Sequence, residues 1–133
     1  MEKKFFSLGA IFAGLAVATG AFGAHGLENM VSAERLLTWE KAVRYQMYHA
    51  FALFFVAWAI VQWREQTKLL ANASWFFIIG IILFSGSLYT LVLMDTLTVA
   101  GINLAYLTPL GGVAFVVGWF MLLIAAQRAQ RGE

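Results

Sequence analysis

The sequence predicts an all-α polytopic membrane protein, with residues 1–133 forming a single four-helix membrane domain. The composition is 62% hydrophobic and 12% charged, whereas ordinary soluble domains are about half apolar and a quarter charged. Four stretches each have the ~20 mostly apolar residues needed to cross a hydrocarbon core of roughly 30 Å. Backbone groups in lipid must be hydrogen-bonded within their own segment, so these spans are expected to be helices.

The four transmembrane helices are expected from about residue 5 to 27, 46 to 63, 70 to 94 and 108 to 127. The first has a rival interpretation, because Lys3 and Lys4 before an apolar run resemble the start of a cleavable signal peptide. The run is longer than the 7–15 apolar residues usual in such a peptide. We therefore expect an uncleaved helix.

The distribution of basic residues predicts the orientation. Four crossings put both termini and the connection between the second and third spans on one side of the membrane. That side carries six basic residues, Lys3, Lys4, Arg64, Lys68, Arg128 and Arg131, and the other side carries three, Arg35, Lys41 and Arg44. Basic residues favour the cytoplasmic side, so we expect a multi-pass protein of the bacterial inner (plasma) membrane with both termini cytoplasmic. The net charge of +2 does not indicate a nucleic-acid partner.

Residues 32–45 have the pattern of an amphipathic helix between the first two spans. Ser32 is an expected N-cap, and Trp39 lies on an apolar stripe at helical spacing. Glu40 and Arg44 have the spacing and order of a favourable ion pair. We expect this helix to lie in the membrane interface, with Trp39 at headgroup depth, before the chain turns into the second span.

Small residues at helical spacing predict where the helices pack, because helices in lipid associate through close contact. The expected packing positions are Ala16, Gly20, Ala24, Gly86, Gly111, Gly112, Ala114 and Gly118. The alternative is a face for self-association. In the segment TPLGG, Thr108 is an expected N-cap and Pro109 fits the first helical position. A helix start of this kind can also bind an anion such as a lipid phosphate.

Polar side chains from all four spans are expected to meet near the extracytoplasmic face. This candidate polar or ligand site comprises His25, Tyr45, Gln46, His49, Ser85, Ser87, Tyr89 and Thr108. In a structural interpretation the side chains hydrogen-bond one another and tie helix ends together. In a functional interpretation His25 and His49 handle a proton or hold a small ligand such as haem.

The sequence indicates no enzyme. It contains no GxSxG, HExxH or P-loop motif, and therefore no expected catalytic residues. There is no cysteine, and two histidines fall short of the usual four zinc ligands, so no metal site is expected. The predicted spans contain no carboxylate, Lys or Arg, which argues against an ion-driven transporter.

Four motifs, GAFGAHGL, WEKAVRYQMYHA, LFSGSLYTL and TPLGG, follow one another along the chain. In order and spacing they resemble the domain of unknown function 423 family, bacterial small membrane proteins similar to transmembrane protein 256. The resemblance covers nearly the whole chain and implies a compact four-helix membrane protein. It implies no activity. Its motif positions overlap the candidate polar site.

We therefore expect a non-enzymatic accessory or scaffold subunit, or a lipid-interacting module, with no cofactor. Its expected partners are membrane lipids and a larger membrane complex or further copies of itself. Two alternatives remain: a small-ligand or haem-binding protein using His25 and His49, and a pathway for protons or small solutes.

Overall fold

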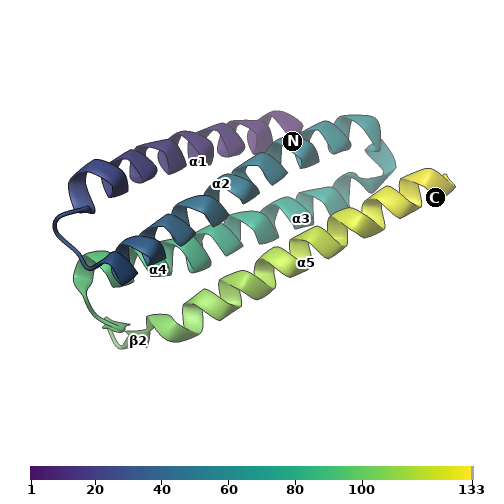
Figure 1. Ribbon diagram of the computed structural model, residues 1–133. Helices are drawn as coiled ribbons and strands as arrows, with labels where there is room; N and C mark the ends of the chain where they lie inside the picture. Colours follow the sequence, from purple (N-terminus) through teal and green to yellow (C-terminus); the bar gives the residue numbers. More distant parts are fainter. Residues whose placement is uncertain (133) are drawn as a thin grey trace.

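The computed structural model describes residues 1–132, which are mostly helical (Figure 1). The elements in chain order are α1 (Glu2–Phe22), the π-helical turn η1 (Gly23–Leu27), α2 (Ala33–Gln62), the 3-10 turn η2 (Arg64–Gln66), α3 (Thr67–Gly80), the π-helical turn η3 (Ile81–Ser85), α4 (Gly86–Met94), β1 (Thr98–Val99), β2 (Ile102–Asn103) and α5 (Leu104–Arg131).

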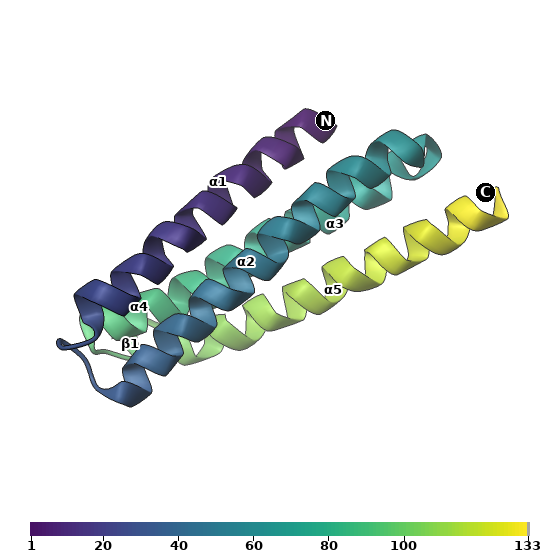
Figure 2. The ribbon, with the colours of Figure 1, turned by 45° about the horizontal axis from the view of Figure 1, so that its top comes forward.

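These elements form four helical rods that run up and down side by side. The rods are α1 with η1, α2, residues 64–94, and α5. Both termini and the connection between α2 and α3 lie at one end, and the other two connections lie at the opposite end (Figures 1 and 2). We call these the terminal end and the hairpin end. In both views α1 and α5 lie on the outer sides, with the other two rods between them.

The outer surface of the bundle is apolar. Large hydrophobic side chains point outward on every rod; Val17, Phe55, Ile82 and Val116 have exposed fractions of 63%, 64%, 58% and 69%. A water-soluble protein rarely presents so continuous an apolar surface. Within residues 1–132, three helical segments are long and apolar enough to cross a membrane: Glu2–Leu27, Arg64–Met94 and Leu104–Arg131.

The second rod differs from the prediction. Residues 33–62 form one uninterrupted helix, so the amphipathic segment is the first part of α2 and does not turn into a separate span. Ser32 caps this helix by accepting a bond from the Arg35 backbone N–H at 3.3 Å. Trp39 is 3% exposed and packs inside the bundle, while its depth in the membrane stays a prediction. Glu40 and Arg44 form no ion pair within the described residues.

The start of α5 also differs from the prediction. Its N-cap is Asn103, whose side-chain oxygen accepts a bond from the Ala105 backbone N–H at 2.9 Å. Thr108 is therefore not the cap, and Pro109 lies inside the helix, where it removes one backbone hydrogen bond. Because the helix begins about one turn earlier, the TPLGG segment has no free N-terminal N–H groups, and the alternative of an anion site there loses its basis.

Glycines face phenylalanines along the contact between residues 64–94 and α5. A Cβ atom at Gly111 would lie 2.4 Å from the backbone nitrogen of Phe84, one at Gly118 would lie 2.6 Å from the Phe77 ring, and one at Gly80 would lie 2.3 Å from the Phe115 ring. The pairs advance in step, one residue forward in α5 for each residue back in the partner, as antiparallel packing requires. We call this contact the glycine–phenylalanine seam.

The other expected packing positions differ in how closely a neighbouring helix approaches them. Ala16 and Ala114 are 0% and 6% exposed, so both lie in helix contacts. Gly20 and Gly112 have room for a Cβ at ordinary contact distance, 3.4 and 3.9 Å from the nearest side-chain atoms. Ala24 is exposed, and a Cβ at Gly86 would meet nothing within 4 Å. Ala24 and Gly86 are therefore not close-packing positions, because the helices turn them away from their neighbours.

Candidate functional site

The largest polar cluster joins three rods through Gln46. The Gln46 side-chain nitrogen donates to the Phe12 backbone oxygen at 2.9 Å, and its side-chain oxygen accepts from the Tyr89 hydroxyl at 2.9 Å. The Tyr89 hydroxyl also lies 3.2 Å from the Thr19 hydroxyl. Gln46 is 4% exposed, and a buried amide left without partners would be costly. These bonds therefore fasten α1 and α4 to α2.

Trp39 extends this cluster toward the hairpin end. Its indole N–H donates to the Thr19 backbone oxygen at 2.8 Å, and its ring lies 4.5 Å from the Tyr89 ring, centroid to centroid. A Cβ at Gly23 would lie 2.6 Å from the Trp39 ring, so only glycine leaves room for the indole there. We define the polar seam as Thr19, Trp39, Gln46 and Tyr89.

His49 belongs to a second cluster, between α2 and α5. Its Nδ1 lies 2.7 Å from the Tyr45 backbone oxygen, and the Trp119 indole N–H donates to its Nε2 at 3.1 Å. An indole N–H only donates and a carbonyl only accepts. His49 is therefore neutral, with its proton on Nδ1. Its ring stacks on Phe115 with a centroid separation of 3.4 Å and an interplanar angle of 6°.

The serines and Thr108 make local bridges. The buried Ser85 hydroxyl donates to the Ala42 backbone oxygen at 2.7 Å, which links η3 to α2. The hydroxyls of Ser87 and Thr108 lie 2.6 Å apart and link α4 to α5. Tyr45 contributes its ring more than its hydroxyl: the ring packs 4.7 Å from that of Phe84, and the side chain is 39% exposed on the outer surface.

The structure does not place His25 and His49 in one polar layer. His25 is exposed in η1 at the hairpin end, and its side chain forms no hydrogen bond within residues 1–132. His49 lies midway along α2, level with the part of α1 between Gly9 and Phe12, which contact Ala50 and Gln46. About 20 Å of helix separates that level from His25, at roughly 1.5 Å per residue. The polar residues are therefore spread along the bundle instead of forming one layer at its rim.

Several residues that the structure places in these clusters were not among the predicted site residues. Thr19 and Trp119 supply side-chain partners, and Arg35 bonds the Val92 backbone oxygen and lies 3.5 Å from the Asp95 carboxylate. Thr19 and Trp119 are single polar groups in apolar spans, so no spacing in the sequence singles them out. Arg35 and Asp95 meet because α2 begins and α4 ends at the hairpin end of the bundle.

The hydrogen bonds of Gln46 and His49 connect neighbouring helices. Both nitrogens of His49 and both ends of the Gln46 amide are engaged by protein groups. A haem iron bound by His49 would have to displace one of these bonds. Within the described chain no three side chains of the types His, Asp and Glu are grouped to hold a metal ion.

Comparison with known proteins identifies the family. The model of the family described as "Protein of unknown function (DUF423)" matches residues 19–112. The chain belongs to this family. Among its relatives, the UPF0382 membrane protein of Staphylococcus saprophyticus is 49% identical over 123 residues, covering 92% of this chain and 95% of the relative. That of Bacillus subtilis is 47% identical over 124 residues, covering 93% and 96%. No solved structure matches.

The DUF423 match includes every residue of the polar seam and His49, and it ends at Gly112. The glycine–phenylalanine seam continues beyond it to Gly118. The relatives are named as membrane proteins, in agreement with the apolar outer surface and the three long apolar helices.

Proposed function

We propose that this DUF423 protein is a four-pass, non-enzymatic accessory or scaffold subunit of the bacterial inner membrane. The observation that carries the proposal is that buried polar side chains are hydrogen-bonded to other groups of the protein itself. Gln46, His49 and Ser85 are each no more than 4% exposed, and each bonds a group on a neighbouring rod. Such side chains stabilise a helix bundle in lipid and leave the outer surface as the part available to partners.

The path of the chain supports four crossings. The rods of residues 2–27 and 64–94 both start at the terminal end (Figure 1). If both cross the membrane in the same direction, the chain must return through α2. Its 30 residues span about 45 Å at 1.5 Å per residue, which exceeds a hydrocarbon core of roughly 30 Å. Lys41 and Arg44 are exposed on α2, and such long side chains can extend toward the headgroups.

The distribution of basic residues supports cytoplasmic termini. Six of the nine Lys and Arg residues belong to the terminal end or its connection, and the positive-inside rule places that end in the cytoplasm. The chain has no cysteine, so single-cysteine labelling can test this without background. A membrane-impermeant maleimide added to intact cells should label Thr98→Cys, and should label Lys68→Cys only after permeabilisation. The reverse pattern would overturn the orientation, and equal labelling of both in intact cells would overturn the four crossings.

The accessory role is tested by affinity purification. The tagged chain, extracted in a mild detergent and analysed by mass spectrometry, should retain a defined membrane partner at a fixed ratio. The matched control is the same chain with Gly118→Leu, which should loosen the bundle and lose the partner. Recovery of the unaltered chain alone, at the mass of a monomer or dimer, would overturn the accessory role.

A further inference from the structure

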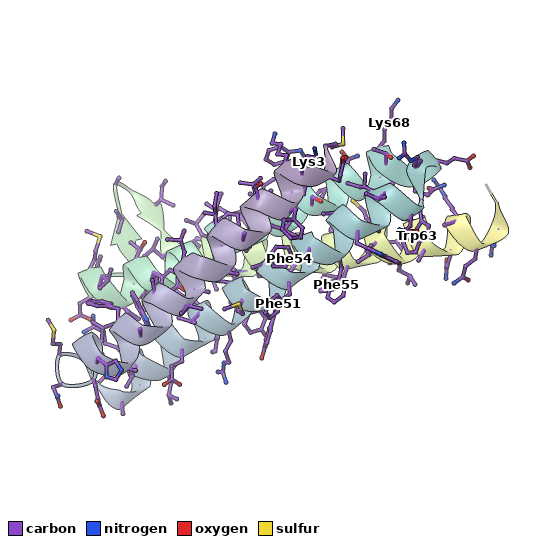
Figure 3. The ribbon with its side chains drawn as sticks, turned by 90° about the horizontal axis from the view of Figure 1, so that it is seen from above. Lys3, Phe51, Phe54, Phe55, Trp63 and Lys68 are labelled. Atoms are coloured by element: carbon purple, nitrogen blue, oxygen red, sulfur yellow. The ribbon has the colours of Figure 1, made fainter. Side chains whose placement is uncertain are left out.

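An apolar groove runs between α1 and α2 near the terminal end. It is an open groove with a volume of about 540 Å³, within the range of roughly 300–1,000 Å³ typical of small-molecule sites. Its floor is Ala57, which is 4% exposed, and its walls are Phe6 from α1 and Trp58 from α2, which are 56% and 57% exposed. Figure 3 shows Lys3 at the same end of the molecule as Lys68, with Phe54, a further groove residue, beside α1.

The groove opens into a polar hollow at the helix ends. This second space encloses about 340 Å³ and shares Glu2 and Val61 with the groove. Arg64 and Thr67 line it, while Lys3 lines the groove beside it. Apolar walls therefore lead directly to a mouth that carries two basic side chains.

These two basic side chains form no ion pair in the described part of the chain, although the Glu2 carboxylate interacts electrostatically with Lys3. The same carboxylate is engaged by the N-terminal amino group at 3.3 Å. Lys4, by contrast, lies over the Trp75 ring at 4.6 Å, on another face of α1. The mouth therefore has a net positive charge that the described residues do not neutralise.

We propose that this groove binds one anionic phospholipid, with an acyl chain between Phe6 and Trp58 and the phosphate at Lys3 and Arg64. The charge of the mouth and the apolar character of the groove together match a molecule that is anionic at one end and hydrocarbon at the other. Each basic side chain near an anionic lipid surface contributes about fivefold to affinity. The inference goes beyond the proposed function and requires no protein partner.

The test uses native mass spectrometry of the full-length protein titrated with phosphatidylglycerol or phosphatidylcholine bearing identical acyl chains. The unaltered protein should bind phosphatidylglycerol more tightly. The double variant Lys3→Gln, Arg64→Gln should lose about 25-fold in phosphatidylglycerol affinity and little in phosphatidylcholine affinity. The matched control is Lys68→Gln, which removes a charge at the same end but outside the groove and should change the affinity less than twofold.

A further variant tests whether the acyl chain binds in the apolar groove. Ser7 lines the groove and is exposed, so Ser7→Phe should fill the groove without disturbing the core and should weaken both lipids about equally. Circular dichroism and thermal unfolding confirm that each variant folds. Equal binding of the two lipids by the unaltered protein, an equal loss for Lys68→Gln, or no effect of Ser7→Phe would each overturn the site. A partner recovered by affinity purification despite any of these results would leave the accessory role standing.

Discussion

Two of the contacts between helices, the glycine–phenylalanine seam and the polar seam, differ in what fills them. The glycine–phenylalanine seam between residues 64–94 and α5 relies on close approach, because phenylalanine rings and the backbone of Phe84 occupy the space that side chains would take at Gly80, Gly111 and Gly118. In the polar seam, Gln46 and Trp39 reach from α2 to backbone oxygens of α1, and Tyr89 joins them from α4.

The difference illustrates how helices associate without a hydrophobic driving force between them. Close packing and interhelical hydrogen bonds are the two available sources of stability in lipid. The glycine–phenylalanine seam should therefore be sensitive to added volume, and the polar seam to loss of a donor or acceptor. The predictions below test this contrast, from the largest expected effect to the smallest.

Gly111→Ala should cause the largest loss of stability, about 3 kcal/mol, the upper part of the range for overpacked sites. The added Cβ would lie 2.4 Å from the backbone nitrogen of Phe84, so whole helices must separate. Thermal unfolding in detergent measures the effect. Gly86→Ala is the matched control, since its Cβ meets nothing within 4 Å and alanine favours the helix by up to about 1 kcal/mol. Equal losses for both variants would contradict the packing argument.

His49→Leu should cost about 2 kcal/mol, because it leaves the Trp119 indole N–H and the Tyr45 carbonyl without this partner. His25→Leu should change the stability by less than about 0.5 kcal/mol, as expected of an exposed residue. Unfolding midpoints of the two variants, measured in the same detergent, give the ranking. Similar midpoints would show that the ring of His49 is not held by its bonds.

The polar seam is tested by a double-mutant cycle between Gln46→Leu and Tyr89→Phe. We expect a coupling free energy of about 1 kcal/mol, within the range measured for hydrogen bonds between membrane helices. The two atoms are 2.9 Å apart, so each single variant removes the same bond. Strictly additive losses would mean that the bond contributes nothing to stability.

Ser87→Ala should have the smallest effect, about 0.6 kcal/mol, an average value for such a bond in lipid. It removes the hydroxyl contact with Thr108, while Thr108 keeps its bond to the Leu104 backbone oxygen. Ser7→Ala, at an exposed position without such a contact, serves as the control. A loss comparable to that of Gly111→Ala would show that this hydroxyl contact contributes as much to the packing of α4 on α5 as the close approach at Gly111 does.

Much of the fold follows from the pattern of apolar residues, but the ends of helices do not. The charged residues between Glu34 and Arg44 led to a predicted break before the second span, whereas α2 runs through them without interruption. His49 consequently lies at the middle of a 30-residue helix instead of near its outer end. Likewise TPLGG resembles a helix start, but the side chain of Asn103 caps α5 one turn earlier.

The candidate site was predicted in part for the same reason. Gln46, Ser85 and Tyr89 do take part in bonds between helices, because a polar side chain in an apolar span must find a partner somewhere. The partner itself depends on how each helix is rotated, which spacing within one helix does not reveal. This is why the Phe12 carbonyl, Thr19 and Trp119 were not among the predicted residues.

By itself, the sequence determined that this chain is a helical membrane protein. With 62% hydrophobic and 12% charged residues, its long apolar segments belong in the hydrocarbon region, where a helix satisfies every backbone hydrogen bond within its own segment. The tertiary structure decided which glycines lie against an aromatic ring of a neighbouring helix and which face outward. It also decided which backbone carbonyl each polar side chain bonds. Those choices depend on the rotation and register of one helix against another, which are set only when all the helices pack together.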